Sequence, residues 1–137
     1  MKNGVVLLDI DKLKCHEEVV GNHVEELRGR IRRDGCLKRP IVVTKNSLVI
    51  LDGHHRFQAL KRMGITKIPA QLVDYKNGEV RVYLRRKELL IQLIKEAILK
   101  RVEEGKLFPP KTTRHLIKNR AGVINFSLEK LKNGGKI

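Results

Sequence analysis

The sequence predicts a small α+β domain, on the evidence of its length, the order of its segments and its turn signals. The chain has 137 residues, a length that suits one domain. Strand-like and helix-like segments follow one another in the order β-α-β-β-α-β-β-α, with short turns between neighbouring strands. An order that mixes hairpins with crossovers favours an α+β domain over a doubly wound parallel sheet. We therefore expect residues 1–137 to form a single domain.

A strand and then a helix are predicted at the beginning of the chain. Residues 4–10 (GVVLLDI) are rich in β-branched and aliphatic side chains, which is typical of a strand. After a loop, Asn22 and Glu25 have the spacing of an N-cap and its acid, so a helix is expected to begin there. Asp34-Gly35 predicts its end. The expected buried face of this helix consists of Val24, Leu27 and Ile31.

A hairpin and a second helix are predicted in the middle of the chain. Residues 40–44 (PIVVT) and 48–52 (LVILD) are two apolar runs separated by Lys-Asn-Ser, which predicts a hairpin. Gly53 then begins a helical pattern that Gly64 ends. The expected buried face of this helix consists of Phe57, Ala59, Leu60 and Met63.

Two strands and a long helix are predicted in the second half. Residues 67–75 and 79–86 have strand patterns, and the turn signal Lys-Asn-Gly stands between them. Residues 87–104 predict the longest helix, which Gly105 ends. Its apolar residues cover more than one stripe, so we expect it to pack on two sides or in a groove between the sheet and another chain.

Charge indicates anionic partners. Thirty Lys and Arg residues oppose fifteen Asp and Glu residues, a net charge of +15. Nucleic acid and phosphorylated small molecules are the two partner classes that fit. A charge-rich surface is also common in proteins of thermophiles, so much of the charge can be a surface property. Aromatic residues make up only 4%, which argues against a stacking platform for single-stranded nucleic acid.

Membrane association is not expected. No apolar run approaches the roughly 20 residues that span a bilayer. The apolar stretch near the N-terminus is too short for a signal peptide and is followed at once by acidic residues. We therefore expect a cytoplasmic protein. Cys15 and Cys36 have no CxxC spacing and are expected to be free thiols, with a reactive thiolate conceivable at Cys15 beside His16.

The first polar cluster is Asp52 to Arg56 (DGHHR), where a strand pattern passes into a helix pattern. Gly53 permits a tight turn and a close backbone approach. The N–H groups that follow lie at a helix N-terminus, which attracts anions. His54, His55 and Arg56 place positive charge where it opposes the helix dipole, and a bound phosphate accounts for that placement. The alternative is a surface turn whose histidines face solvent.

The second cluster is His16-Glu17-Glu18 (HEE). A carboxylate beside an imidazole can be a general base or a metal ligand, although exposed Glu-Glu pairs without a role are common. A metal site made of His16, His54 and His55 is conceivable, but no metal-ligand spacing supports it.

The third cluster lies in residues 109–115 (PPKTTRH). After two prolines come two fixed cations, two hydroxyls and an imidazole, and all of them can donate hydrogen bonds to a phosphate or a carboxylate. A basic loop that caps a last short helix is the alternative. The five residues concerned are Lys111, Thr112, Thr113, Arg114 and His115.

Together these features resemble the ParB/sulfiredoxin-like fold. The stretch GCLKRPIVVTKNSLVILDGHHRFQALKRMGITKIPAQLVDY carries the resemblance, which covers about residues 5–75 as a core. Sulfiredoxins have a catalytic cysteine where this chain has His54. ParB partition proteins have a helix-turn-helix region and a dimerisation segment after this domain, and the remaining chain is too short for both. The free serine kinases of archaea and bacteria have all three clusters in this order.

Resemblance to the serine kinases implies phosphoryl transfer from ATP or ADP, with Mg²⁺ bridging the phosphates, to the hydroxyl of free L-serine. It implies that Glu17 is the general base and that Asp52 orients substrate or metal-bound water. The sequence itself has no dedicated carboxylate cage, so Mg²⁺ is expected to be held mainly by the phosphates. The implied phosphate-binding residues are Gly53, His54, His55, Arg56, Lys111, Thr112 and Thr113. The implied substrate-binding residues are His16, Arg114 and His115.

One departure and two alternatives remain. Longer family members have a sizeable insertion between the core and the PKTTRH motif, where this chain has only one strand and one helix, so the choice between ATP and ADP stays open. The C-terminal helix and the PKTTRH motif make up the segment 87–120. The alternatives are a ParB-like nucleic-acid-binding module with a nucleotide switch and a nucleotide hydrolase. A basic stripe for the former would consist of Arg28, Arg30, Arg32, Arg33, Lys38 and Arg39. For a kinase we expect only weak, non-specific nucleic-acid binding. Arg30 and Arg33 are expected to lie on the first helix, away from the three clusters. The oligomeric state stays open.

Overall fold

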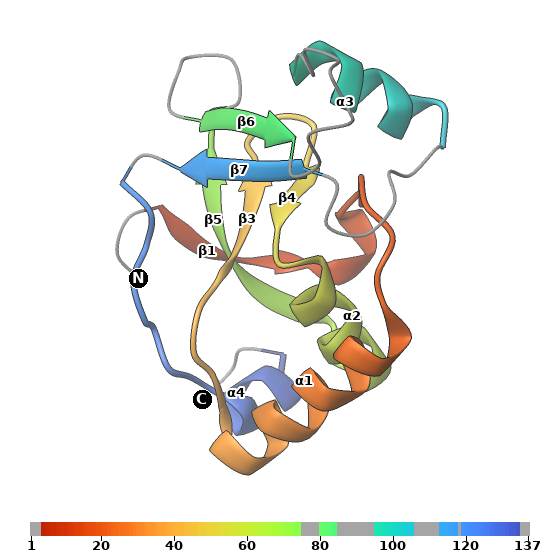
Figure 1. Cartoon of the computed structure of the whole chain (residues 1–137). Coiled ribbons are helices and arrows are strands. Elements are labelled where there is room, and N and C mark those ends of the chain that lie inside the picture. The colour runs from red at the N-terminus through yellow and green to blue at the C-terminus, as the bar shows by residue number, and fades with distance from the viewer. Residues whose placement is uncertain (1–3, 75–79, 85–94, 106–112, 118, 135–137) are drawn as a thin grey trace.

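A four-stranded sheet with the order β1-β5-β3-β4 forms the centre of the molecule (Figure 1). The computed structural model describes residues 4–74, 80–84, 95–105, 113–117 and 119–134, with the backbone alone for 80–84, 95–97 and 113–116. The strands of the sheet are β1 (Val5–Asp9), β3 (Ile41–Thr44), β4 (Ile50–Asp52) and β5 (Lys67–Val73). Pairing is antiparallel for β1–β5 and β3–β4 and parallel for β3–β5, so the sheet is mixed. The predicted α+β class is therefore confirmed.

Helices and smaller ribbons surround this sheet (Figure 1). The helices are the 3₁₀ turn η1 (Ile10–Lys12), α1 (Gly21–Asp34), α2 (His54–Arg62), α3 (Lys95–Glu103) and α4 (Leu128–Lys132). The ribbons pair β2 (Cys36–Leu37) with β8 (Phe126–Ser127) and β6 (Val80–Leu84) with β7 (Thr113–Ile117). In Figure 1, α1, α2 and α4 gather at one end, and α3 lies with β6 and β7 at the other. Within the described ranges, no helix is long and apolar enough to cross a bilayer.

Both faces of the sheet are covered, which explains the unbroken apolar runs of β3 and β4. Ile41 and Val43 belong to the larger core cluster, which the buried residues of α1 and α2 complete. Val42 and Leu51 belong to a second cluster that contains Ile98 of α3. Alternate residues of one strand therefore enter two cores, as the period of a strand requires.

Most of the predicted elements are confirmed. The hairpin is present, and Gly35 follows α1 with a left-handed φ of 67°. The expected buried faces of α1 and α2 pack into the larger core, with Leu27 and Met63 partly buried. Gly105 follows α3, but residues 85–94 lie outside the described residues, as does the predicted turn at 76–78.

The predicted N-cap of α1 is wrong. The helix begins at Gly21, its N-cap is Val20, and no side chain caps it. The Val20 N–H donates to Nε2 of His55 at 3.1 Å, so a tertiary contact fixes the residue before the helix. Asn22 then lies inside the first turn, where its side chain cannot act as the cap.

Candidate active site at the Gly53 turn

The turn between β4 and α2 requires glycine. Gly53 has φ 98°, a left-handed conformation that side chains rarely adopt. A Cβ atom at this position would lie 2.5 Å from Cγ2 of Ile41 and 2.9 Å from Nη2 of Arg56. The backbone therefore passes close to β3 at the point where α2 begins, with its first N–H groups at the end of the helix that attracts anions.

The two histidines of the turn hold the preceding loop. His54 is buried, and its Nε2 accepts a hydrogen bond of 3.2 Å from the backbone N–H of His16. His55 accepts from Val20 in the same way. Each ring thus uses Nε2 as an acceptor, which requires that Nε2 carry no proton. A phosphate contact from either ring would have to come from Nδ1, so their predicted phosphate-binding role stays a prediction.

His16 is fully buried and is fixed on both sides of its ring. Its Nδ1 donates to the carbonyl oxygen of Ile50 at 2.6 Å, because a carbonyl can only accept. Its Nε2 lies 3.4 Å from Oε2 of Glu17, whose side chain is 10% exposed. The ring also meets that of His54 edge to face, with 4.7 Å between centroids. A mostly buried carboxylate therefore lies beside an oriented imidazole, an arrangement suited to a general base.

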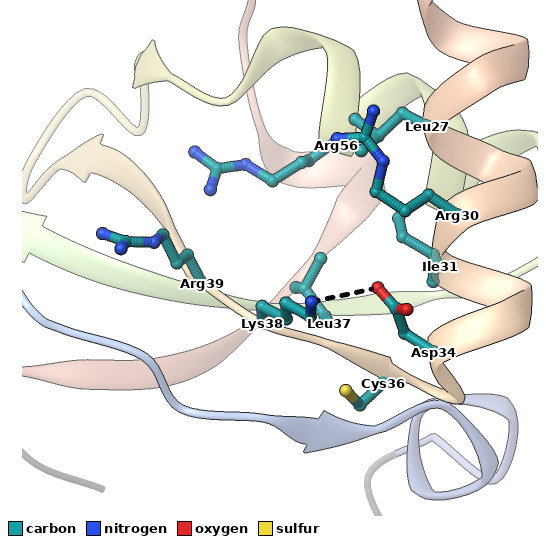
Figure 2. A pocket seen from close by; sticks show the side chains of 9 residues that line it. All are labelled: Leu27, Arg30, Ile31, Asp34, Cys36, Leu37, Lys38, Arg39 and Arg56. Atoms are coloured by element: carbon teal, nitrogen blue, oxygen red, sulfur yellow. Dashed lines mark ion pairs between the residues drawn. The ribbon is translucent and has the colours of Figure 1, made fainter.

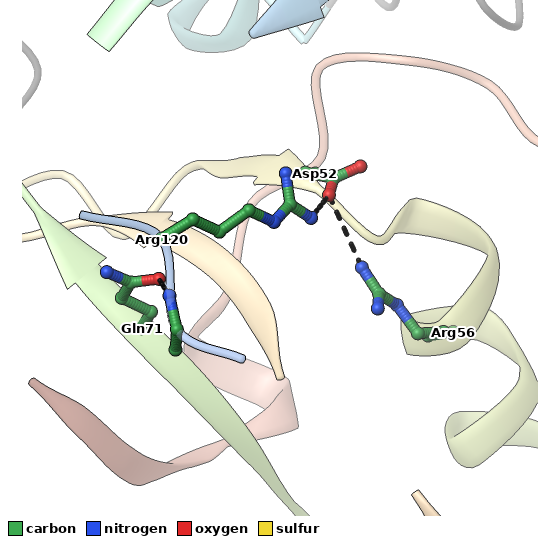
Figure 3. Close-up of polar contacts among 5 residues, drawn as sticks. Asp52, Arg56, Gln71 and Arg120 are labelled. Atoms are coloured by element: carbon green, nitrogen blue, oxygen red, sulfur yellow. Dashed lines mark hydrogen bonds and ion pairs between the residues drawn. The ribbon is translucent and has the colours of Figure 1, made fainter. Parts of the chain in front are cut away.

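Asp52 joins two arginines from distant parts of the chain (Figure 3). Its Oδ2 accepts from Nη2 of Arg56 at 3.4 Å and also from Nη2 of Arg120. Burial opposes ionisation of Asp52, yet its pKa lies below the usual range because Arg56 and Arg120 outweigh that effect. Burial lowers the pKa of Arg56, Asp52 opposes this, and Arg120 and Arg39 lower it further. The turn is thus rich in positive charge.

A cavity of about 190 Å³ opens beside Arg56 (Figure 2). Four of its lining residues are cationic: Arg30, Lys38, Arg39 and Arg56. Its one acidic lining residue, Asp34, forms an ion pair of 3.5 Å with Lys38. The excess of positive charge suits an anionic ligand. Arg30 was expected to lie away from the clusters, and that expectation is wrong because α1 turns this residue toward the cavity.

Two of the three sequence clusters meet in the structure, and the third is described in part. The HEE cluster lies against the DGHHR turn through the contacts of His16 with His54 and Ile50. Lys111 and Thr112 lie outside the described residues. Thr113, Arg114 and His115 belong to β7, whose side chains here also lie outside the description. The alternative of a basic loop is wrong for these three residues, because they pair with β6 as a strand.

Sequence reasoning missed Arg120. Its partner Asp52 is 68 positions away, and no local motif separates Arg120 from the other basic residues of the chain. Gln71, which holds the backbone on either side of Arg120, was read only as part of a strand.

The cysteines and histidines form no metal centre in the described part of the chain. No group of three or more His, Cys, Asp or Glu side chains there could hold a metal ion. The conceivable site of His16, His54 and His55 is therefore not formed. Cys15 and Cys36 are both free thiols. Burial raises the pKa of Cys15, and nearby Lys61 offsets this only in part, so the conceivable reactive thiolate is disfavoured.

The ParB N-terminal domain model matches residues 2–87. The chain belongs to the ParB N-terminal domain family. The matched segment contains the whole four-stranded sheet, α1 and α2, and both the HEE cluster and the Gly53 turn. The resemblance inferred from the motifs is therefore confirmed at the level of the family.

Relatives in this family carry two kinds of name. An ATP-dependent L-serine kinase of Staphylothermus marinus is 40% identical over 81 residues, which cover 56% of this chain and 32% of the relative. A ParB-like protein of Sulfolobus acidocaldarius is 45% identical over 71 residues (52% and 35%). An ADP-dependent L-serine kinase of Thermococcus kodakarensis is 30% identical over 86 residues (60% and 36%). The chain thus spans about a third of the length of the curated relatives that it matches.

A solved structure extends the likeness beyond the matched segment. A free serine kinase in complex with AMP superimposes with a TM-score of 0.85 and covers 96% of this chain and 95% of that chain. The identity is 18%, so this comparison establishes a shared fold. Because 96% of this chain is covered, the likeness extends past residue 87, where the family match ends.

Proposed function

We propose that this protein is a nucleotide-dependent kinase that phosphorylates the hydroxyl of free L-serine to give O-phospho-L-serine. The observation that carries the proposal is the contact between the buried His16 and the mostly buried Glu17, held against the Gly53 turn by the contact between His16 and His54. Phosphoryl transfer to a hydroxyl needs a base for the acceptor and cationic groups for the phosphates. The relatives that are named L-serine kinases supply the acceptor.

On the acceptor side, Glu17 takes the proton from the serine hydroxyl while the terminal phosphoryl group moves from the nucleotide to the serine Oγ. The nucleotide leaves one phosphate shorter. The ring of His16, which the hydrogen bond to Ile50 fixes, holds the Glu17 carboxylate as an ion pair when both ring nitrogens carry protons. Arg114 and His115 are assigned to substrate binding on the strength of the PKTTRH motif alone.

On the donor side, the phosphates bind at the N-terminus of α2, where Gly53 lets them approach the backbone. Arg56 neutralises part of their charge. The cavity of about 190 Å³ beside Arg56 adds Arg30, Lys38 and Arg39, further cations that can neutralise phosphate charge. Lys111, Thr112 and Thr113 are assigned to the phosphates from the motif, and His54 and His55 from their place in the turn.

Asp52 has the second catalytic assignment, which is to orient the substrate or a metal-bound water. Its Oδ2 already accepts from two arginines. The described carboxylates form no cage for Mg²⁺. We therefore propose that the nucleotide phosphates supply most of the Mg²⁺ ligands, as is usual for this ion.

The test is to incubate the protein with Mg²⁺, with ATP or ADP, and with each amino acid in turn, followed by detection of phosphoserine by mass spectrometry. Formation of phosphoserine from one donor supports the proposal and settles ATP against ADP. Serine compared with threonine measures acceptor tolerance. No phosphorylated amino acid from either donor would refute it.

A second candidate is a nucleic-acid-binding module with a nucleotide switch. The relative from S. acidocaldarius, named only as ParB-like, favours it, as does the row of exposed arginines on α1. Such a module would bind DNA with sequence preference and form no phosphoserine.

A further inference from the structure

We propose that Arg120 is an additional phosphate-binding residue of this site, contributed by the segment after β7. The inference rests on the proposed function, and its ligand class is the polyphosphate of a nucleotide. Gln71 is a positioning residue for Arg120, and Asp52 is the counter-ion that holds the guanidinium near the turn in the absence of ligand.

The backbone around Arg120 is fixed by a buried amide. Gln71 belongs to the central strand β5 and is 4% exposed. Its Nε2 donates to the carbonyl oxygen of Asn119 at 2.9 Å, and its Oε1 accepts from the N–H of Ala121 at 2.8 Å. One side chain thus holds the residues on both sides of Arg120, and Ala121 is itself buried. A buried amide whose NH₂ group and oxygen both form hydrogen bonds holds the backbone that it contacts in one position.

The side chain of Arg120 leaves this anchored segment toward the Gly53 turn (Figure 3). It meets the same Asp52 oxygen that accepts from Arg56. Asp52 directly precedes Gly53, so the guanidinium lies at the N-terminus of α2, where a phosphate would bind. Two segments 68 positions apart in the sequence therefore bring their cations to one point.

The charge balance at this point favours an anion. Arg56 interacts electrostatically with the guanidinium groups of both Arg120 and Arg39, and Asp52 is the carboxylate that interacts with Arg56 and Arg120. Three positive charges against one negative charge leave an excess of two. Like charges at short distance are unfavourable, and a polyphosphate would relieve them.

The contact between Arg120 and Asp52 can exchange for a ligand. Their side chains are 36% and 38% exposed, so water reaches both. An ion pair with this exposure contributes little to stability. Charge-assisted hydrogen bonds from arginine to phosphate are stronger, and they are often bidentate. Arg120 can therefore move from the carboxylate to a phosphate at small cost.

The test measures binding of ATP, ADP, AMP and inorganic tripolyphosphate by calorimetry to the wild type and to Arg120→Gln. We expect affinity for ATP, ADP and tripolyphosphate to fall about tenfold or more, and affinity for AMP to fall less than about threefold. The matched control is Arg62→Gln, which removes an arginine of α2 with 39% exposure that pairs with Glu25 at 2.8 Å. It should change each affinity less than about twofold.

Gln71→Leu tests the positioning role. It should lower the ratio of ATP to AMP affinity in the same direction as Arg120→Gln, a readout that general destabilisation does not move. An unchanged ratio in Arg120→Gln would overturn the proposal and leave Arg120 as a counter-ion of Asp52. A wild type that binds ATP in this Arg120-dependent way but forms no phosphoserine would remove the proposed function alone. A wild type that binds neither ATP nor tripolyphosphate would overturn both.

Discussion

His16 donates from Nδ1 to the carbonyl oxygen of Ile50 at 2.6 Å, and this bond fixes the imidazole ring that lies beside Glu17, the candidate base. The Ile50 carbonyl belongs to β4, the strand that leads into the Gly53 turn. The opposite ring nitrogen, Nε2, is thereby directed at Glu17. The proposed base is thus tied through one imidazole to the strand that presents the proposed phosphate site.

Glu17→Gln should lower turnover at least about a hundredfold, the usual contribution of a general base. The amide keeps the shape of the side chain but cannot take a proton from serine. Nucleotide binding should persist, because the role proposed for Glu17 is on the acceptor side. Steady-state kinetics and calorimetry on the same preparation measure the two effects. Glu18→Gln, a neighbouring exposed acid, is the control, and a loss of turnover there with normal Glu17→Gln would move the base by one residue.

Gly53→Ala should destabilise the protein by about 2 kcal/mol or more, measured by chemical denaturation. The left-handed φ costs an alanine about 1–2 kcal/mol, and its Cβ would lie 2.5 Å from the Ile41 side chain, which adds overpacking. Gly29→Ala is the matched control, because Gly29 lies inside α1 with no atom within 4 Å of a new Cβ. That change should stabilise by about 0.5–1 kcal/mol. Equal stability of the two variants would contradict the argument.

The sequence predicts those features of the fold that neighbouring residues determine, and it misses those that depend on residues far away in the chain. Gly35 and Gly53 were predictable because a left-handed turn next to a helix is a local demand on one residue. The N-cap at Asn22 was predicted wrongly, because a contact from His55, which is distant in sequence, fixes the chain at Val20.

Elements that depend on residues distant in the sequence could not be predicted, because no local sequence pattern marks them. The strands β2 and β8 have two residues each and exist through their pairing across the chain. Arg120 acquires its place from Gln71 and Asp52 in the same way. The motif HEE was visible as chemistry, but the burial of His16 and the low exposure of the Glu17 side chain came only with the fold, and Glu18 of the same motif stays exposed.

Asp52 should make stability depend on pH in the acidic range. Its pKa in the folded protein is lowered below the ordinary value of 3.8. A carboxyl with a lowered folded pKa contributes stability that is fully present above the unfolded pKa and is lost as pH falls through the folded pKa. The contribution should therefore be present at neutral pH and disappear as pH falls below about 4. Thermal melts of Asp52→Asn should show a shallower acid limb than the wild type.

Arg120→Gln should also make the loss of stability at acidic pH shallower than in the wild type. The change should be smaller than for Asp52→Asn, because Arg56 still holds the pKa of Asp52 down. Melting temperatures compared across the acidic range at constant ionic strength give the measurement. Identical acid limbs in the wild type and in Asp52→Asn would show that Asp52 contributes nothing to the pH dependence.

The last prediction separates the surface charge of α1 from the site. Arg32 and Arg33 are exposed on α1 and do not line the cavity, whereas Arg30 does. If the protein is a kinase, binding to duplex DNA should be weak, independent of sequence and steeply lost with added salt, because it comes from counterion release. Replacing Arg32 and Arg33 by glutamine should then reduce DNA retention and leave phosphoserine formation nearly unchanged. Replacing Arg56 by alanine should do the reverse, because that guanidinium lies at the turn and in the cavity. Filter binding over a salt series and the kinase assay measure both effects on the same variants. A salt-resistant, sequence-selective DNA complex, with no phosphoserine from ATP or ADP, would refute the kinase and favour the nucleic-acid-binding module.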